Sequence, residues 1–286
     1  MKPSASGPFP YVPLPKRPQL HWPNGARLAF WVVVNFEYFP LDQKVPGGHG
    51  KVPDIVAFSR RDYGNRVGAF RIMERMAKYG VRGTANINAD LCTAHPEIVA
   101  EAKRLNWEFM AHGRSNSRPM HELPPDRERA EIREAIEIIT KATGVRPRGW
   151  MGPGMHETWN TLDYLADEGM IYNADWINDD QPYLMDINGK KMVQIPYGDQ
   201  PHDKGALERL HYTTDEFIQL VKDHVDTLYA EGGKVAVVAL HPYVAGQSYR
   251  IRMVDEILSY VTRHRDVWCA TGGEIADAFL KSPATF

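Results

Sequence analysis

Long apolar runs alternate with amphipathic segments along this chain. Residues 28–35 are apolar, β-branched and aromatic until the final Asn35, and residues 235–240 have the same character. Such runs are typical of strands that are covered on both faces. Residues 125–143 carry apolar side chains at helical spacing and are followed by Gly144, which predicts a helix that ends there.

The same alternation continues through the chain. Further strands are expected at residues 81–88, 107–111, 149–151, 171–174 and 192–195. Further helices are expected at residues 96–105, 158–168, 215–230, 251–263 and 273–281, with another that begins at an Asp62 cap and runs to Gly80. Strands that alternate with helices in about six or seven units indicate one parallel α/β barrel rather than two domains.

Composition narrows the class of partner. The 286 residues contain 34 Lys and Arg against 36 Asp and Glu, a formal charge of −2, which does not favour binding to nucleic acid. Only two cysteines occur, Cys92 and Cys269, so neither a disulfide framework nor a thiolate zinc site is expected. We therefore expect a cytoplasmic protein.

The first 23 residues contain seven prolines and no apolar run, unlike a secretory signal. No segment approaches the roughly 20 apolar residues that span a bilayer, so no membrane partner is expected. The predicted organisation is a proline-rich arm at residues 1–26, lying on the protein or on a neighbouring subunit, and a single barrel domain at residues 27–286.

Polar residues follow the predicted strands. In α/β barrels the functional groups lie where strands end, because the loops there surround one pocket. This rule selects Asn35 and Glu37, the cluster 112–116, the turn 152–154, the pair Asp175 and Trp176, and His241.

Each selected residue also has a structural interpretation. Glu37 could be a salt-bridged loop acid, and an isolated histidine such as His112 is more often structural. Pro242 ends the strand before it and leaves His241 at the sheet edge. His156 could border the pocket, while His121 lacks the spacing of a helical zinc site and His202 is expected to be a surface or structural residue.

Together, these strand ends resemble the polysaccharide deacetylase family, the NodB-homology or carbohydrate esterase 4 group, from about residue 28 to residue 280. An acidic motif, a His-rich motif, a Pro-Gly turn, an Asp-Trp segment and Leu240-His241 occur in the family's order. The resemblance implies a distorted (β/α)7-type, NodB-like barrel of the α/β class. It also implies a hydrolase acting on carbon–nitrogen bonds other than peptide bonds, and a homotetramer.

The motifs depart from the family pattern. Asn35 and Glu37 stand near the places of two aspartates, the usual HxxxH reads His112 to Asn116, and Met151 aligns with an arginine that orients the base. These departures, with residues 61–71 and the proline-rich arm, resemble the subgroup of PuuE-type allantoinases and cyclic imide hydrolases. That subgroup hydrolyses small cyclic ureides, imides or other amides.

The resemblance then implies roles for individual residues. Glu37 acts as base or metal ligand, His112 as ligand or oxyanion contact, and His241 as acid, with Asp175 in the fourth catalytic motif. The expected metal ligands are Glu37, His112 and Asn116, for a divalent metal such as zinc or for none, since a carboxamide is a poorer zinc donor than imidazole. The residues expected to contact a small-molecule substrate are Asn35, Arg114, Trp150 and Trp176.

Two alternatives stay open at this point. One is metal-dependent N-deacetylation of an acetylated amino sugar or polysaccharide, which belongs to carbohydrate metabolism. The other is a barrel that only binds a ligand. The presence of an acid and two imidazoles at strand ends favours hydrolysis over simple binding.

Overall fold

The computed structural model describes residues 2–199 and 201–283, and within them the strands form one curled sheet. The sheet has nine strands in the order β6-β7-β5-β4-β3-β2-β1-β8, and β9 pairs with the start of β1. The strands are β1 (Leu28–Phe36), β2 (Thr84–Ile87), β3 (Glu108–Ala111), β4 (Gly149–Trp150), β5 (Tyr172–Asn173), β6 (Tyr183–Ile187), β7 (Lys190–Gln194), β8 (Lys234–Leu240) and β9 (Val267–Cys269).

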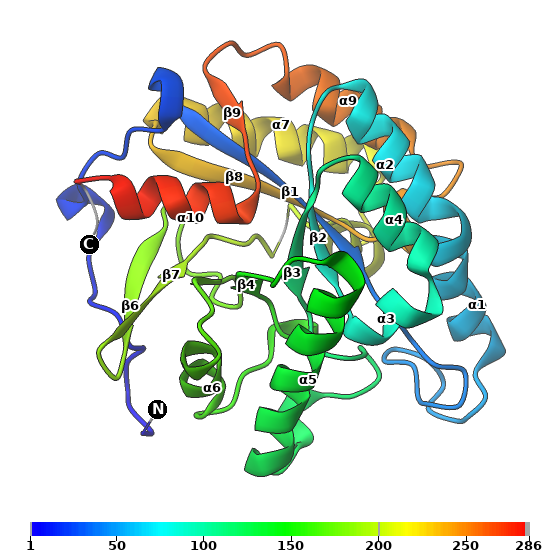
Figure 1. Cartoon of the computed structure of the whole chain (residues 1–286). Helices are drawn as coiled ribbons and strands as arrows, with labels where there is room; N and C mark the ends of the chain where they lie inside the picture. Colours follow the sequence, from blue (N-terminus) through cyan, green and yellow to red (C-terminus); the bar gives the residue numbers. More distant parts are fainter. Residues whose placement is uncertain (1, 200, 284–286) are drawn as a thin grey trace.

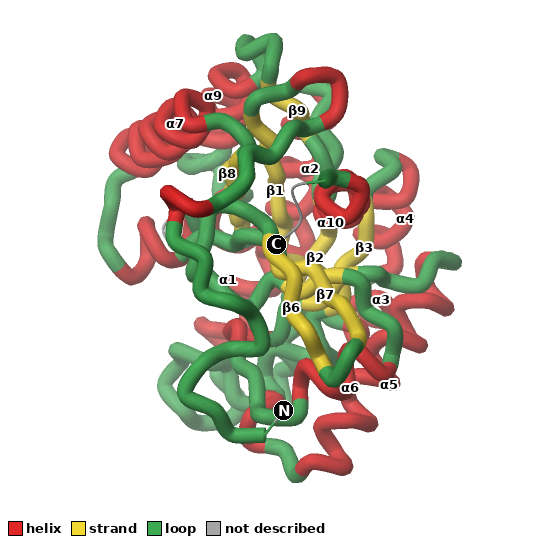
Figure 2. The backbone as a smooth tube through the Cα atoms, turned by 90° about the vertical axis from the view of Figure 1, so that its left-hand side faces the viewer, coloured by secondary structure: helices red, strands yellow, loops and turns green. Residues whose placement is uncertain are grey.

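Helices cover the outside of this sheet, as Figures 1 and 2 show. They are α1 (Ile55–Tyr63), α2 (Ala69–Lys78), α3 (Ala89–Ala94), α4 (Pro96–Arg104), α5 (Pro125–Thr143), α6 (Thr161–Asp167), α7 (Thr214–Glu231), α8 (Pro242–Ala245), α9 (Arg252–Val261) and α10 (Gly272–Lys281). Helices that alternate with strands around one curled sheet give the distorted α/β barrel that the resemblance implies. Among the described residues, the segment after β7 meets β8 through a single parallel bridge, between His202 and Ala239. A continuous ladder of backbone hydrogen bonds therefore does not close the barrel at that point.

The strand register brings the ends of β1, β2, β3 and β8 to one edge. Phe36 pairs with Ile87, and Ile87 pairs with Ala111, while Val34 pairs with Leu240. Because all four strands are parallel, the residues that follow these pairs emerge side by side. Glu37 and His112 therefore lie at one level and His241 lies nearly level with them.

Alternation along the strands decides which side chains enter the barrel. Ala29, Trp31 and Val33 pack with interior residues of the other strands, whereas Leu28, Phe30 and the other even-numbered residues of β1 pack against the outer helices. Successive side chains of a strand point to opposite faces. Asn35 and Glu37 continue the interior series of β1.

The other two strands place their histidines by the same rule. His112 continues the interior series from Met110 in β3, and His241 continues the series Val235, Val237 and Ala239 in β8. Each of the three side chains thus enters the barrel at the same edge because of its position in the two-residue repeat.

Two local predictions were wrong. The helix expected to begin at Asp62 begins instead after Asp54, whose side chain accepts a hydrogen bond from the Ala57 amide. It continues through a π-helical turn into α2. The hairpin of β6 and antiparallel β7 was missed, although Asn188 and Gly189, both with positive φ, form the kind of turn that marks a tight hairpin.

The described part of the N-terminal arm, residues 2–26, lies against its own barrel. Phe9 packs edge-on against Trp176, the Asp186 amide donates to the Pro8 carbonyl, and Trp22 Nε1 donates to the Lys234 carbonyl. Figure 1 shows this blue segment passing beside β6. The division of the chain into an arm at residues 1–26 and a barrel domain at residues 27–286 stays a prediction. Residue 1 of the arm and residues 284–286 of the barrel domain lie outside the described residues.

Candidate active site

Three polar side chains from three strand ends meet in one cavity. Glu37 Oε1 lies 3.5 Å from His241 Nε2 and 3.9 Å from His112 Nε2, and it accepts a 2.6 Å hydrogen bond from Asn116 Nδ2. All four residues line a cavity of about 340 Å³. Glu37, His112 and His241 are almost completely buried. The structure thus brings together the acid and the two imidazoles that lie far apart in sequence.

Glu37 is held as a carboxylate. Burial acts to raise its pKa, but the charge and the hydrogen bond of His241 outweigh burial and hold the pKa well below its usual range. The charge of Lys204, another residue lining the cavity, acts in the same direction. A buried acid in this setting is ionised at neutral pH.

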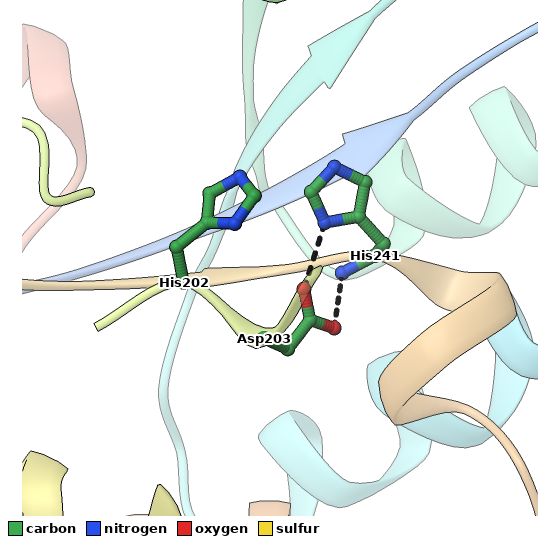
Figure 3. A group of neighbouring side chains, drawn as sticks. All are labelled: His202, Asp203 and His241. Carbon is green, nitrogen blue, oxygen red and sulfur yellow. Dashed lines mark hydrogen bonds and ion pairs between the residues drawn. The ribbon is translucent and has the colours of Figure 1, made fainter. Parts of the chain in front are cut away.

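His241 is paired with an acid that the sequence analysis missed. Its Nδ1 lies 2.7 Å from Asp203 Oδ1, and its backbone amide donates to Asp203 Oδ2 at 2.7 Å (Figure 3). Burial acts to lower the pKa of His241, but the charges of Glu37 and Asp203 raise it to about 9. The ring is an imidazolium at neutral pH, and its Nε2–H faces Glu37.

His202 was expected to be a surface or structural residue, and the structure places it at the cavity. It lines the cavity, and its ring lies 4.7 Å from that of His241. Its Nδ1 accepts from the Gly205 amide, and burial lowers its pKa to about 4, so it is neutral.

His202, Asp203 and His241 also lie close enough together to be considered as metal ligands. Asp203 Oδ1 faces His241 Nδ1 and the Lys204 amide, while Oδ2 accepts from the His241 amide. With its carboxylate so engaged, the group is better described as an acid–imidazole pair beside a neutral histidine.

His112 has one fixed ring orientation. Its Nδ1 lies 2.6 Å from the Met151 carbonyl oxygen, and since a carbonyl only accepts, Nδ1 carries the proton. Nε2 therefore presents a lone pair toward the cavity and cannot donate to an oxyanion. Of the two roles expected of His112, this tautomer favours that of a ligand over that of an oxyanion contact.

The expected metal ligands fit a divalent cation. Glu37 Oε2, His112 Nε2 and Asn116 Oδ1 are buried and have no hydrogen-bond partner within the described protein. All three present lone pairs, and the Nδ1–H of His112 is bound to a backbone carbonyl, as in metal-ligating histidines. The same three acceptors also suit the N–H groups of a bound molecule.

Four expected site residues lie elsewhere, and the chain geometry gives the reason. The side chains of Trp150 in β4 and of Asp175 directly after β5 point to the face of the sheet that packs against the helices. Trp150 is fully buried there, and Asp175 accepts a hydrogen bond from the Gly152 amide. Gly113, with a φ of 61°, turns the chain so that Arg114 pairs with Asp90 and Glu134. Trp176 donates to Glu157 and packs on Phe9, outside the residues that line the cavity.

Other residues complete the wall. Asn35 lines the cavity, donates to the Tyr197 hydroxyl at 3.2 Å and accepts from Asn86 at 2.8 Å. His121 and His156 form a ring pair with centroids 4.4 Å apart at the same cavity. The expectation that His156 borders the pocket agrees with this placement, whereas no sequence signal distinguished His121.

The model of the polysaccharide deacetylase family matches residues 50–172 of the chain. This match covers less than half of the 286 residues, and it confirms the resemblance of the chain to that family. A Schizosaccharomyces pombe protein, itself a predicted polysaccharide deacetylase, is 25% identical over 90% of this chain and 92% of its own length. A Helicobacter pylori peptidoglycan deacetylase is 23% identical over 82% of this chain and 90% of its own length.

Among solved structures, the chain is similar to PuuE allantoinase, with a TM-score of 0.85 and 25% identity over 94% of this chain and 95% of that one. Members of this family are amidohydrolases, and the chain is an enzyme of that class, a hydrolase of carbon–nitrogen bonds other than peptide bonds. In the described part of the chain, no helix combines the length and apolar character needed to cross a membrane.

Proposed function

We propose that this enzyme opens the ring of a small cyclic ureide or imide by adding water to a ring carbonyl. The observation that carries the proposal is the contact of ionised Glu37 with protonated His241 inside a cavity of about 340 Å³. This volume lies at the lower end of the range for small-molecule sites, roughly 300–1,000 Å³. The likeness to PuuE allantoinase supports the same class of substrate.

The acceptors in the cavity match such a ring. Glu37 Oε2, His112 Nε2 and Asn116 Oδ1 all need a donor, and cyclic ureides and imides carry ring N–H groups. Asn35, which lines the same cavity, offers a further amide to the substrate. A substrate with several N–H groups would therefore satisfy buried groups that have no protein partner.

Glu37 and His241 stand in the protonation states that hydrolysis requires. Glu37 takes a proton from water as the water oxygen bonds to the carbonyl carbon. His241 gives its Nε2 proton to the departing nitrogen as the carbon–nitrogen bond breaks. The proton on Glu37 then returns to His241 across the 3.5 Å contact, which restores the starting state.

The remaining charges support this sequence of events. Lys204 lines the cavity and provides positive charge for the oxyanion that forms on the carbonyl oxygen. Because the low pKa of Glu37 makes it a weak base, the carbonyl must be reactive, and imide and ureide carbonyls are more electrophilic than ordinary amides. Asp203 keeps His241 oriented and charged.

A divalent cation, if bound, would be held by Glu37, His112 and Asn116 and would polarise the carbonyl or the attacking water. The same ligand set favours a second candidate function, metal-dependent N-deacetylation of an acetylated amino sugar, which the Helicobacter pylori relative's name also supports.

An assay of the purified chain on allantoin, succinimide, a dihydropyrimidine and N-acetyl chitooligomers, with and without chelator, separates the two candidates. We expect a ring-opened product and no acetate. Acetate release from the chitooligomers, lost with chelator, would establish the second candidate instead.

Assembly and location stay predictions. The resemblance implies a homotetramer, and light scattering coupled to gel filtration would measure its mass. Cytoplasmic location would be measured by fractionation of the cells that produce the protein.

A further inference from the structure

A chain of hydrogen bonds links the buried Asp175 to His112 through one peptide group. The Met151 carbonyl oxygen lies 2.6 Å from His112 Nδ1, and the amide of the same peptide, Gly152 N–H, donates to Asp175 Oδ1 at 2.8 Å. Imidazole, peptide and carboxylate are thus in series. Hydrogen bonds in series polarise one another, so a negative charge on Asp175 makes the Met151 oxygen a stronger acceptor.

The far end of the chain holds Asp175 in place and ionised. Asn173 Nδ2 lies 3.0 Å from Glu157 Oε1 and 3.2 Å from Asp175 Oδ2, while Asn173 Oδ1 accepts from the Asp175 amide at 2.7 Å. Trp176 Nε1 donates to the other oxygen of Glu157. These donors, like the Gly152 amide, are fixed to the end of β5 or to the loop that follows β4.

The two acids differ in how readily they ionise. Burial and the adjacent charge of Asp175 raise the pKa of Glu157 well above its usual range, whereas that of Asp175 is raised to about 6. Of the two acids, Asp175 therefore ionises first as pH rises. The negative charge thus lies on the acid that contacts the Gly152 amide.

We propose that Asp175 is a positioning residue, which acts through the Met151–Gly152 peptide to hold His112 in the tautomer that presents the Nε2 lone pair to the cavity. Glu157 keeps Asp175 oriented for this task. The inference rests on the proposed function only where kcat and KM are measured, because the tautomer of His112 is a property of the protein without substrate. It gives Asp175, which the resemblance placed in the fourth catalytic motif, a role through His112.

The chain offers a matched control in Glu108, at the opposite end of the strand that carries His112. Its side chain is partly buried and also accepts from a backbone amide, that of Gly273, at 3.0 Å. Glu108→Gln changes an acid with a similar backbone partner without touching the peptide next to His112.

The test is the nitrogen spectrum of ¹⁵N-histidine-labelled, chelator-treated protein at about pH 8, where imidazoles of ordinary pKa are neutral. His112 is assigned with His112→Gln. We expect one protonated Nδ1 and one unprotonated Nε2 in the unmodified protein and in Glu108→Gln. In Asp175→Ala the two signals move toward each other as the tautomers exchange, with a smaller movement in Asp175→Asn, which keeps an acceptor.

If Asp175→Ala does not fold, Asp175→Asn alone decides. An unchanged His112 spectrum in a folded Asp175 variant, or a protonated Nε2 in the unmodified protein, would overturn the proposal. On the cyclic substrate, Asp175→Asn should lower kcat about 10- to 100-fold with little change in KM, as for other groups that orient a histidine. Absence of ring opening by the unmodified protein would overturn the proposed function and leave the spectral result standing.

Discussion

Two glutamates at opposite ends of the barrel, buried Glu37 and partly buried Glu108, have opposite surroundings. Glu37, at the carboxyl edge, contacts two imidazoles, has a lowered pKa and keeps Oε2 without a protein partner. Glu108, at the amino edge, accepts from Thr84, Tyr172 and the Gly273 amide, and burial raises its pKa. Burial alone does not distinguish function from structure, whereas the partners of the carboxylate do.

The largest expected effect separates the two glutamates. Glu37→Gln should lower kcat/KM for ring opening by about 10²–10⁴-fold, because it removes the base, while the protein stays folded. Glu108→Gln should retain activity and lose about 1–3 kcal/mol of unfolding free energy, because an amide nitrogen would face hydrogen-bond donors. Steady-state kinetics and urea unfolding of both variants measure this, and equal activity losses in the two would break the contrast.

The partners of Glu37 provide the second comparison. Asp203→Asn removes a charge that raises the pKa of His241 to about 9. His241 acts while protonated, so activity is lost as pH rises through its pKa, and the variant should lose activity at lower pH. At neutral pH we expect a loss of about 10- to 100-fold. A pH–rate profile with the same alkaline limb in both proteins would show that His241 is not the acid.

The third change concerns the donor set around Glu37. Asn116→His replaces a carboxamide with an imidazole and should tighten zinc binding by about tenfold or more, because imidazole is the better zinc ligand. Isothermal titration with zinc measures the difference, and His121→Gln, a change of another cavity histidine, serves as control. Equal zinc affinity of Asn116→His and the unmodified protein would remove Asn116 from the ligand set.

The smallest expected effect is the pH dependence of the stability that Glu108 contributes. Its raised pKa means that the folded protein holds the proton more tightly than the unfolded chain, so this stability is full below about pH 4.3 and is lost as pH rises through the folded pKa. The destabilisation by Glu108→Gln should therefore be smaller at pH 8 than at pH 5. Urea unfolding at the two pH values checks this, and a larger cost at pH 8 would contradict the sign.

The sequence could predict which edge of the sheet carries the site, but the face of the sheet that each side chain occupies was not predicted for every residue. Strand ends led to Glu37, His112 and His241, and the two-residue repeat would also have assigned Trp150 and Asp175 to the helix-facing side. Asp203 and His202 could not be found in this way, because they lie in a loop that meets β8 through one bridge rather than after a predicted strand. Their contact with His241 depends on chain packing that no local pattern encodes.

The measurement that tests the account most directly is a double-mutant cycle of Glu37→Gln and His241→Gln, in kcat/KM on the cyclic substrate that is turned over fastest. If the two residues act as one acid–base unit, the double variant should be no slower than the slower single variant. Losses that multiply in the double variant would contradict the account, because each residue would then contribute without the other.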